Sequence, residues 1–262
     1  MKKVISFFLM GIFVFTTFVA CEKDIDDLAT PKDSANISVI DLYESTEEAA
    51  NLYFSKVRNT LERTPMTEDN KTATSQDIVR KEFVKTFEPN AAAIKQFNHR
   101  DGNYEAYSDK EFAAIKFETQ AEERIVSQIY QLHKIGSTER LVQYLNEVKS
   151  DIFDENSSLD METKRRLAIF ISPMLSIAKT FELNQASVLR ADKCWKAAGR
   201  AALGGALIGG LRGLAKGCIT GAVLGFNPGS AAAGCMGGLI VGTISGAAAG
   251  VASGYTACKI FP

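Results

Sequence analysis

The sequence predicts an all-α protein, a helical bundle followed by a glycine-rich helical hairpin. Apolar residues recur at helical spacing through almost all of residues 37–192. In the last third of the chain, twelve glycines fall on two ladders with a period of four, separated by the turn signal Phe-Asn-Pro-Gly-Ser at 226–230. The chain also changes from acidic to basic just before the first ladder, since all 31 acidic residues precede Lys193. These observations predict two parts, an acidic α-helical domain over 37–192 and a cationic hairpin over 193–262.

The N-terminus predicts an export signal over residues 1–20. Two lysines precede an apolar stretch that ends in small residues, the pattern of a secretory signal peptide. The segment Phe-Val-Ala-Cys at 18–21 resembles a bacterial lipobox, although family members usually carry Leu where Phe18 stands. This resemblance implies that Cys21 is lipidated and becomes the first residue of the mature chain. A plain signal peptide or an uncleaved signal anchor are the alternatives.

Residues 21–36 are expected to form an acidic tether. Glu22 stands where inner-membrane retention would favour Asp, which points to the outer membrane. The run 22–27 resembles the export tag of surface lipoproteins in one phylum of Gram-negative bacteria, and Asp33-Ser34-Ala35 resembles a short O-glycosylation site of that phylum. The resemblance implies display at the cell surface, with Ser34 as the glycosylation candidate. A simple solvated tether is the alternative.

Capping signals predict the first helices of the acidic domain. Ser45 with Glu48 forms a capping box, and Thr74 with Asp77 suits a second start, in a helix that Pro89 closes. Between Glu22 and Asp192 the 31 acidic residues outnumber the 22 basic ones, which leaves this part of the chain, tether included, with a charge of about −9.

The rest of the domain is expected to hold three more helices. The box 108–111 predicts the start of a long helix that Gly136 ends, followed by a shorter helix over 139–153. Another helix starts at 157–160 and is kinked by Pro173. The segments between the helices are expected to be loops: 64–75, 98–107 and 154–158.

No catalytic or metal-binding constellation is evident in the sequence. His99 and His133 are the only histidines, and neither has a second His or Cys at metal-ligand spacing. A phosphate-binding loop, a Gly-x-Ser-x-Gly elbow and a basic-aromatic patch for nucleic acid are all missing from the sequence. We therefore expect no enzymatic activity, no cofactor, no metal and no nucleic-acid partner.

The glycine ladders predict close helix packing. Each glycine costs about 1 kcal/mol relative to alanine inside a helix, so close backbone contact must offset twelve such costs. Each ladder spans about 30 Å, roughly the thickness of the hydrocarbon part of a bilayer. A flexible linker is the alternative, but the intervening residues are mostly Leu, Ile, Val and Ala. The packing candidates are Gly205, Gly209, Gly213, Gly217, Gly221 and Gly225 in the first arm, and Gly234, Gly238, Gly242, Gly246, Gly250 and Gly254 in the second.

Four cysteines support the hairpin. A nested pairing of Cys194 with Cys258 and Cys218 with Cys235 has its midpoint near residue 226, close to the turn. The glycine ladders instead pair symmetrically about residue 229.5, and the two registers differ by about 10 Å along the axis. A disulfide tolerates only about 7 Å between Cα atoms, so one register must give way or the turn must be asymmetric.

The hairpin has features of a membrane-active segment. Residues 230–258 carry no charge, whereas Arg212 and Lys216 make a spontaneous span by the first arm unfavourable. A hairpin lying at the interface, or one inserting as an oligomer, fits better. Trp195 and Tyr255 are candidate interfacial anchors, and ordinary packing against the body is the alternative.

Residues 197–258 resemble glycine-rich class II bacteriocins in their Gly-xxx-Gly spacing, Gly/Pro turn, cationic character and cysteines. Those peptides are usually secreted free behind a Gly-Gly leader, whereas this segment is joined to a lipidated body. The resemblance implies a hairpin that inserts into membrane lipid or forms pores. Together with the lipobox it suggests a lipid-anchored outer-membrane protein, and the charge split suggests that the acidic body shields the hairpin until contact or proteolysis. The alternative is a non-toxic structural, oligomerising or binding lipoprotein. A homo-oligomer through the glycine zipper is expected, and an immunity or envelope partner is left open.

Overall fold

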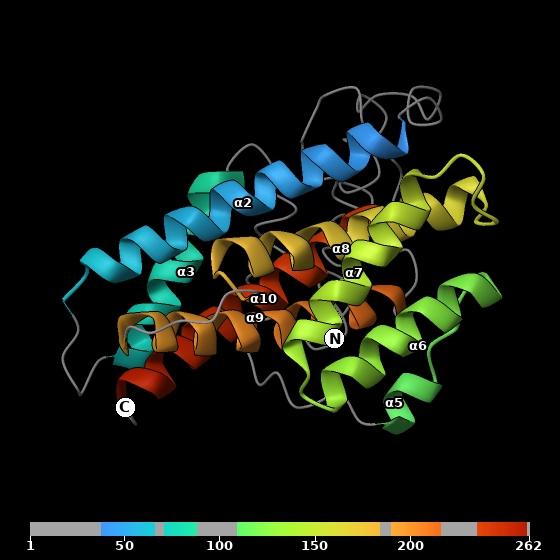
Figure 1. Ribbon diagram of the computed structural model, residues 1–262. Helices are drawn as coiled ribbons and strands as arrows, with labels where there is room; N and C mark the ends of the chain where they lie inside the picture. Colours follow the sequence, from blue (N-terminus) through green and yellow to red (C-terminus); the bar gives the residue numbers. More distant parts are fainter. Residues whose placement is uncertain (1–37, 66–70, 88–108, 184–189, 216–234, 261–262) are drawn as a thin grey trace, which may run out of the picture.

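The computed structural model describes residues 38–65, 71–87, 109–183, 190–215 and 235–260, and these form an all-helical bundle (Figure 1). No strand occurs within these ranges, so the predicted fold class is confirmed. The helices are α2 (Val39–Arg63), α3 (Lys71–Phe87), α5 (Asp109–Ala113), α6 (Gln120–Lys134), α7 (Thr138–Phe153), α8 (Met161–Thr180), α9 (Arg190–Ala215) and α10 (Cys235–Ile260).

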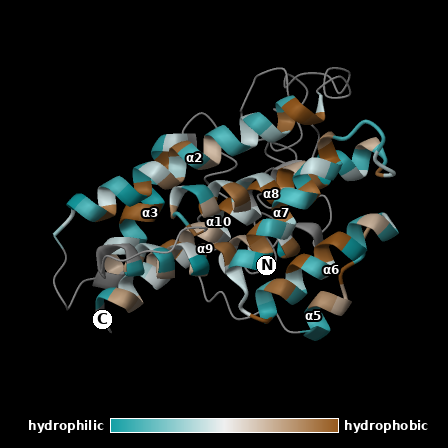
Figure 2. Cartoon of the chain, viewed as in Figure 1, coloured by the Kyte–Doolittle hydropathy of each residue, from teal (hydrophilic) through white to brown (hydrophobic). Residues whose placement is uncertain are grey.

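Helices α9 and α10 lie side by side in the middle of the bundle (Figure 1). The two helices contact each other along much of their length, and both also contact α8. Helix α3 packs on α10, and α2 packs on α8 and α3. Helix α7 lies between α8 and α6 and packs on both. Hydrophilic and hydrophobic residues alternate on α2, α6 and α7, as expected of helices with one face in the core and one in water (Figure 2).

The first helix starts earlier than expected. The start predicted at Ser45 is wrong, because α2 begins at Val39 after the N-cap Ser38. The Ser38 hydroxyl accepts a hydrogen bond from the Asp41 amide at 3.0 Å, which satisfies one of the free amides of the first turn. Ser45 instead donates its hydroxyl to the Leu42 carbonyl inside the helix.

The next helix also begins before its predicted capping residues. Helix α3 starts at Lys71, so Thr74 lies within the helix and the expected loop 64–75 is shorter than predicted. The expected loop over 98–107 lies outside the described residues.

The long helix predicted after residue 108 is broken into two. Helix α5 ends at Ala113, and α6 begins only at Gln120. Thr119 caps α6 by accepting the Glu122 amide, while the Glu122 carboxylate accepts the amide of Glu118, the residue before the cap, so the chain starts a new helix inside the expected one. The predicted stop is confirmed, since Gly136 follows α6 with φ of +73°.

The network behind this cap joins α6 to α8. The Glu122 carboxylate is 2 % exposed and accepts Arg166 Nε at 2.9 Å. Arg166 also pairs with Glu118 on the adjoining turn.

The predictions for the last body helices are close to the structure. Helix α7 ends at Phe153 as expected, and the loop at 154–158 is confirmed. Helix α8 is capped by Asp160 rather than Ser157, because the Asp160 carboxylate accepts the Thr163 amide at 2.9 Å. Pro173 lies inside α8, which continues to Thr180.

One hydrophobic core includes both the acidic body and the glycine-rich tail. Buried side chains of α2, α6, α7 and α8 form a single cluster with those of α9 and α10. Helix α9 starts at Arg190, three residues before the boundary expected from charge. The tail is therefore packed inside the bundle and supplies its central pair of helices.

Candidate functional site: a glycine-packed, disulfide-linked hairpin

The α9–α10 pair is held together by direct backbone contact. A Cβ added at Gly205 would lie 2.0 Å from the Gly246 carbonyl oxygen, and one at Gly209 would lie 1.9 Å from that of Gly242. Ordinary contacts of a Cβ begin near 3.4 Å. Only glycine permits this approach, so the prediction of close packing by these four ladder residues is confirmed.

The second ladder extends past the first in this register. Gly250 faces Ala201, and Gly254 faces Ala197. The glycines therefore do not pair symmetrically about residue 229.5. Alanine continues the four-residue ladder of α9 toward its N-terminus and is small enough for the facing glycines to approach closely. The repeat Ala197, Ala201, Gly205, Gly209 was a signal in the sequence for this offset pairing.

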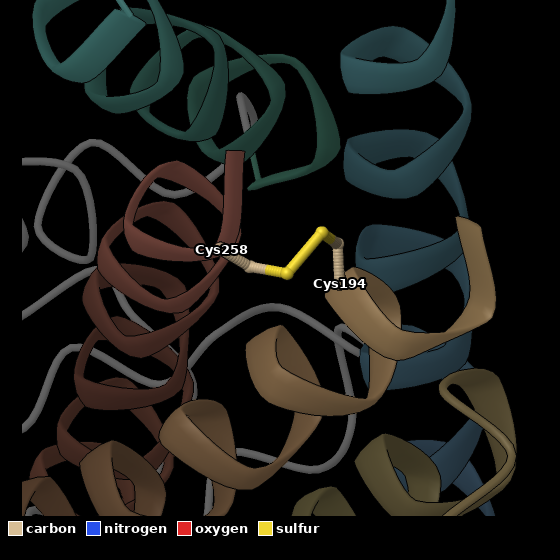
Figure 3. The surroundings of a disulfide bond; sticks show 2 residues. All are labelled: Cys194 and Cys258. Atoms are coloured by element: carbon tan, nitrogen blue, oxygen red, sulfur yellow. A yellow bond between two sulfur atoms is a disulfide. The ribbon is translucent and has the colours of Figure 1, made fainter. Parts of the chain in front are cut away.

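A disulfide between Cys194 and Cys258 closes the open end of the hairpin (Figure 3). Their Cα atoms lie 5.2 Å apart, within the range of a normal disulfide. The midpoint of this pair and that of the contacting glycines both lie near residue 226. The conflict between registers is thus resolved in favour of the cysteines, with the glycine ladders offset by two steps.

Three glycines of α9 that lie beside the ladder pack against side chains of the body. These contacts were not predicted from the sequence. A Cβ at Gly210 would lie 2.5 Å from the Phe170 ring, one at Gly204 would lie 2.8 Å from the His133 ring, and one at Gly199 would lie 2.6 Å from Phe181 Cβ. Burial under α9 lowers the pKa of His133. In the sequence these glycines differ from the ladder glycines only in falling outside the four-residue repeat. No local pattern identifies the side chain that each one contacts.

The two candidate anchors, Trp195 and Tyr255, stack on each other inside the protein. Their ring centroids are 4.4 Å apart, and each residue is 6 % exposed. Phe181 also stacks on Trp195, with ring centroids 5.9 Å apart, and the Arg58 guanidinium lies 5.6 Å from the Trp195 ring centroid. Packing against the body, the alternative considered for these aromatics, is the arrangement observed. Their use as membrane anchors stays a prediction for another state.

Four basic residues of the tail lie near the disulfide. Lys193 and Arg200 are exposed and Lys196 is half-buried; the three share one face of α9. Arg200 reaches Glu139 of α7 at 4.0 Å, an exposed and therefore weak ion pair. Lys259 lies 5.4 Å from the Tyr255 ring centroid. Arg212 is half-buried in α9.

Several predicted site residues lie beyond what the structure describes. The side chains of Gly213, Gly238 and Cys235 are not described, although all three positions are helical. The following residues lie outside the described ranges: Cys21, Ser34, Lys216, Gly217, Cys218, Gly221, Gly225 and Gly234. Lipidation, glycosylation, the Cys218–Cys235 pair and the inner ends of both ladders therefore stay predictions.

Within the described ranges, no three His, Cys, Asp or Glu side chains gather as they would around a metal ion. None of the helices in those ranges combines the length and apolar composition that crossing a bilayer requires. Comparison with protein-family models, with curated proteins and with solved structures found no match to this chain.

Proposed function

We propose that this protein is a lipid-anchored envelope protein that stores a membrane-active, bacteriocin-like hairpin in the centre of its own helical bundle. The observation that carries the proposal is the burial of the α9–α10 pair as a covalently linked, backbone-packed unit. The surrounding helices keep the hairpin from water until a target membrane offers another apolar environment.

The contacts of the hairpin fall into two kinds, and this favours movement as a unit. Contacts between α9 and α10 are backbone to backbone and are closed by a disulfide. Contacts with the body at Gly199, Gly204 and Gly210 are made by side chains of the body. Departure from the bundle would break the second kind and preserve the first, so the pair can leave without unfolding.

The composition of the hairpin suits the surface of a membrane. Residues 230–258 carry no charge, and helices that are uncharged on every side belong in a core or in lipid. The basic face formed by Lys193, Lys196 and Arg200 would meet anionic headgroups, each cation near the surface contributing about 1 kcal/mol. An interfacial hairpin with these cations in the headgroup layer fits both features.

A disulfide between α3 and α10 tests whether the hairpin must leave the bundle. The Ser75 and Thr256 hydroxyl oxygens lie 2.8 Å apart in the core, so Ser75→Cys/Thr256→Cys can lock α10 to α3. A matched control, Thr119→Cys/Thr163→Cys, joins the start of α6 to α8 at a similar 3.0 Å and leaves the hairpin unlocked. All variants carry Cys21→Ser, so that a lipid anchor does not determine vesicle binding.

The measurement is release of a trapped dye from anionic vesicles by the oxidised proteins. We expect leakage from the parent and from the α6–α8 control, and none from the α3–α10 lock. Leakage by the locked protein at the parent rate would show that the hairpin need not leave. An inert parent would remove the membrane-active function.

A non-toxic binding or structural lipoprotein is the second candidate, favoured by one observation. Every glycine of α9 and α10 whose surroundings are described packs against its own chain. A homo-oligomer through the zipper would therefore require the hairpin to leave the bundle first. This candidate predicts a monomer that never causes leakage, and size measurement in the vesicle experiment separates the two.

A further inference from the structure

The turn that ends α8 carries a glutamate at a position that favours glycine. The Leu183 amide donates to the Ala178 carbonyl at 3.0 Å and the Glu182 amide to the Lys179 carbonyl at 3.2 Å, the hydrogen bonds of a Schellman cap. Glu182 occupies the left-handed position of this cap, with φ of +52°. Glycine adopts this conformation freely, whereas a side chain makes it unfavourable. A contact that uses the Glu182 carboxylate would offset that cost.

Arg58 of α2 holds this turn and also reaches the hairpin. Its guanidinium donates to the Thr180 carbonyl at 2.7 Å and pairs with the Glu182 carboxylate at 3.7 Å, while its Nε pairs with Glu62 at 3.2 Å. The same guanidinium lies 5.6 Å from the centroid of the Trp195 ring, within range of a cation–π interaction. The end of α8 and a neighbouring turn of α2 thus hold the Arg58 charge beside an aromatic ring of α9.

The turn itself packs on the hairpin. A Cβ at Gly199 would lie 2.6 Å from Phe181 Cβ and 2.9 Å from Leu183 Cδ2, so both side chains lie against α9 at this glycine. Phe181 also stacks on Trp195, which is four residues before Gly199 and therefore on the same face of the helix. Trp195 stacks on Tyr255 of α10. The turn is therefore connected to both arms of the hairpin by ring and backbone contacts.

The polar part of this contact is open to water. The Arg58 side chain is 26 % exposed, and those of Glu62 and Glu182 are 43 % and 55 % exposed. In contrast, the hydroxyls of Ser75 and Thr256, which join α3 to α10, lie in the core. Exposed ion pairs exchange their partners for water at little cost. Separation of the hairpin from the body can therefore start at Arg58 more easily than at the α3–α10 contact.

We propose that Arg58 and the turn at 180–183 form a latch that holds the hairpin in the bundle and sets how readily it leaves. The latch rests on the function proposed above, which requires the hairpin to leave. Arg58 makes the direct contact with Trp195, and Thr180 and Glu182 position its guanidinium. When the guanidinium moves off the ring, water reaches the Trp195–Tyr255 stack beside the disulfide, and the end of the hairpin is freed from the body.

Arg58→Gln tests the latch in two assays on the oxidised full chain carrying Cys21→Ser. The first is dye release from anionic vesicles. The second uses no lipid and measures how fast a maleimide labels an added Ser75→Cys, whose thiol is covered by Thr256 until α10 separates from α3. Peptide mass spectrometry identifies the labelled residue. We expect Arg58→Gln to raise both rates about fivefold, because it removes the cation–π contact and a charged hydrogen bond.

Two controls separate the latch from a general loosening of the fold. Arg63→Gln removes an exposed arginine from the last turn of the same helix and should leave both rates unchanged. Val148→Ala removes buried methyl groups from α7, whose main contacts are with α8 and α6. Compared at temperatures equally far below each melting temperature, Val148→Ala should have the rates of the parent, and Arg58→Gln should still be faster.

Glu182→Gly provides a result that a purely structural role of this residue would not. Glycine suits the left-handed backbone, so the melting temperature should be unchanged or higher. Loss of the carboxylate leaves Arg58 less firmly positioned, so both rates should rise about twofold. Faster release without loss of stability is expected only if Glu182 acts on the hairpin through Arg58.

The two assays keep the latch and the membrane-active function distinguishable. Faster labelling of Arg58→Gln without leakage from any protein would support the latch and remove the function. Leakage from the parent, with Arg58→Gln labelled and leaking at the parent rates, would overturn the latch and leave the function. Equal increases in Arg58→Gln and Val148→Ala would also overturn the latch. Parent rates in Glu182→Gly would exclude the positioning role of Glu182.

Discussion

Gly205→Ala should destabilise the protein even though alanine is the better helix former. The new Cβ would stand 2.0 Å from the Gly246 carbonyl oxygen, where ordinary contact begins near 3.4 Å. It therefore needs about 1.4 Å more room than the α9–α10 interface provides. The obstructing atom belongs to the backbone, so a change of rotamer cannot supply that room.

The expected loss follows from two opposing terms. Overpacking that forces backbone shifts costs up to about 3 kcal/mol. The better helix propensity of alanine returns about 1 kcal/mol. The net loss is about 2 kcal/mol, which for a protein of this length lowers the melting temperature by about 4–8 °C.

Thermal unfolding followed by circular dichroism at 222 nm, with the disulfide intact, measures this loss. Gly254→Ala, on the second ladder, is the comparison at the same helix pair, since its Cβ would meet the Ala197 carbonyl oxygen at 2.8 Å and needs a smaller shift. Its packing cost should be smaller than that at Gly205, so Gly254→Ala should lose less stability than Gly205→Ala. A stabilised Gly205→Ala protein, or equal losses at both positions, would refute backbone contact as the reason for glycine at 205.

Three further changes probe other parts of the bundle. Replacing Cys194 and Cys258 by serine opens a loop of 64 residues and should lower the free energy of unfolding in urea by about 4 kcal/mol; an unchanged midpoint would contradict a structural role. Arg166→Ala leaves the buried Glu122 carboxylate without its main partner and should cost about 3–5 kcal/mol, measured by the same titration. Burial lowers the pKa of His133, so the unfolded chain takes up this proton at higher pH than the folded one, and stability falls as pH drops below about 6.5. Between pH 7 and pH 5 the melting temperature of His133→Gln should fall less than that of the parent. If the two melting temperatures fall in parallel, His133 does not contribute to the pH dependence.

Local signals in the sequence predicted several features because their physics is local. Gly136 ends α6 because a left-handed backbone conformation suits glycine. The start of α8 was predicted to within 157–160, and Asp160 caps the helix through a hydrogen bond from an amide three residues away. The pairing of Cys194 with Cys258 followed from their symmetry about the turn.

Other features depend on competition between sites and were not predictable in this way. Ser38 and Ser45 both offer a capping hydroxyl, and the burial of Val39 and Leu42 in the core favours the earlier start. The break between α5 and α6 depends on Glu122, whose ion pair with Arg166 lies 44 residues along the chain. Long-range partners of this kind leave no pattern in the local sequence.

The burial of the tail was also not predictable, because its glycines pack against side chains that lie far away in the sequence. Gly204 and Gly210 look like extra members of a zipper, but their value to the fold lies in the rings of His133 and Phe170. Composition showed that α9 and α10 need close neighbours. Only the structure identifies those neighbours as the helices of the same chain.

Because the cysteines and the glycines share one register, the Cys194–Cys258 disulfide can form in only one alignment of α9 and α10. A hairpin slipped by one ladder step would move the arms by about 6 Å, which would place the Cα atoms of Cys194 and Cys258 about 8 Å apart. That distance is too long for a disulfide, so only the correctly aligned hairpin can be sealed. A repetitive glycine ladder offers many similar alignments, and one covalent bond selects among them.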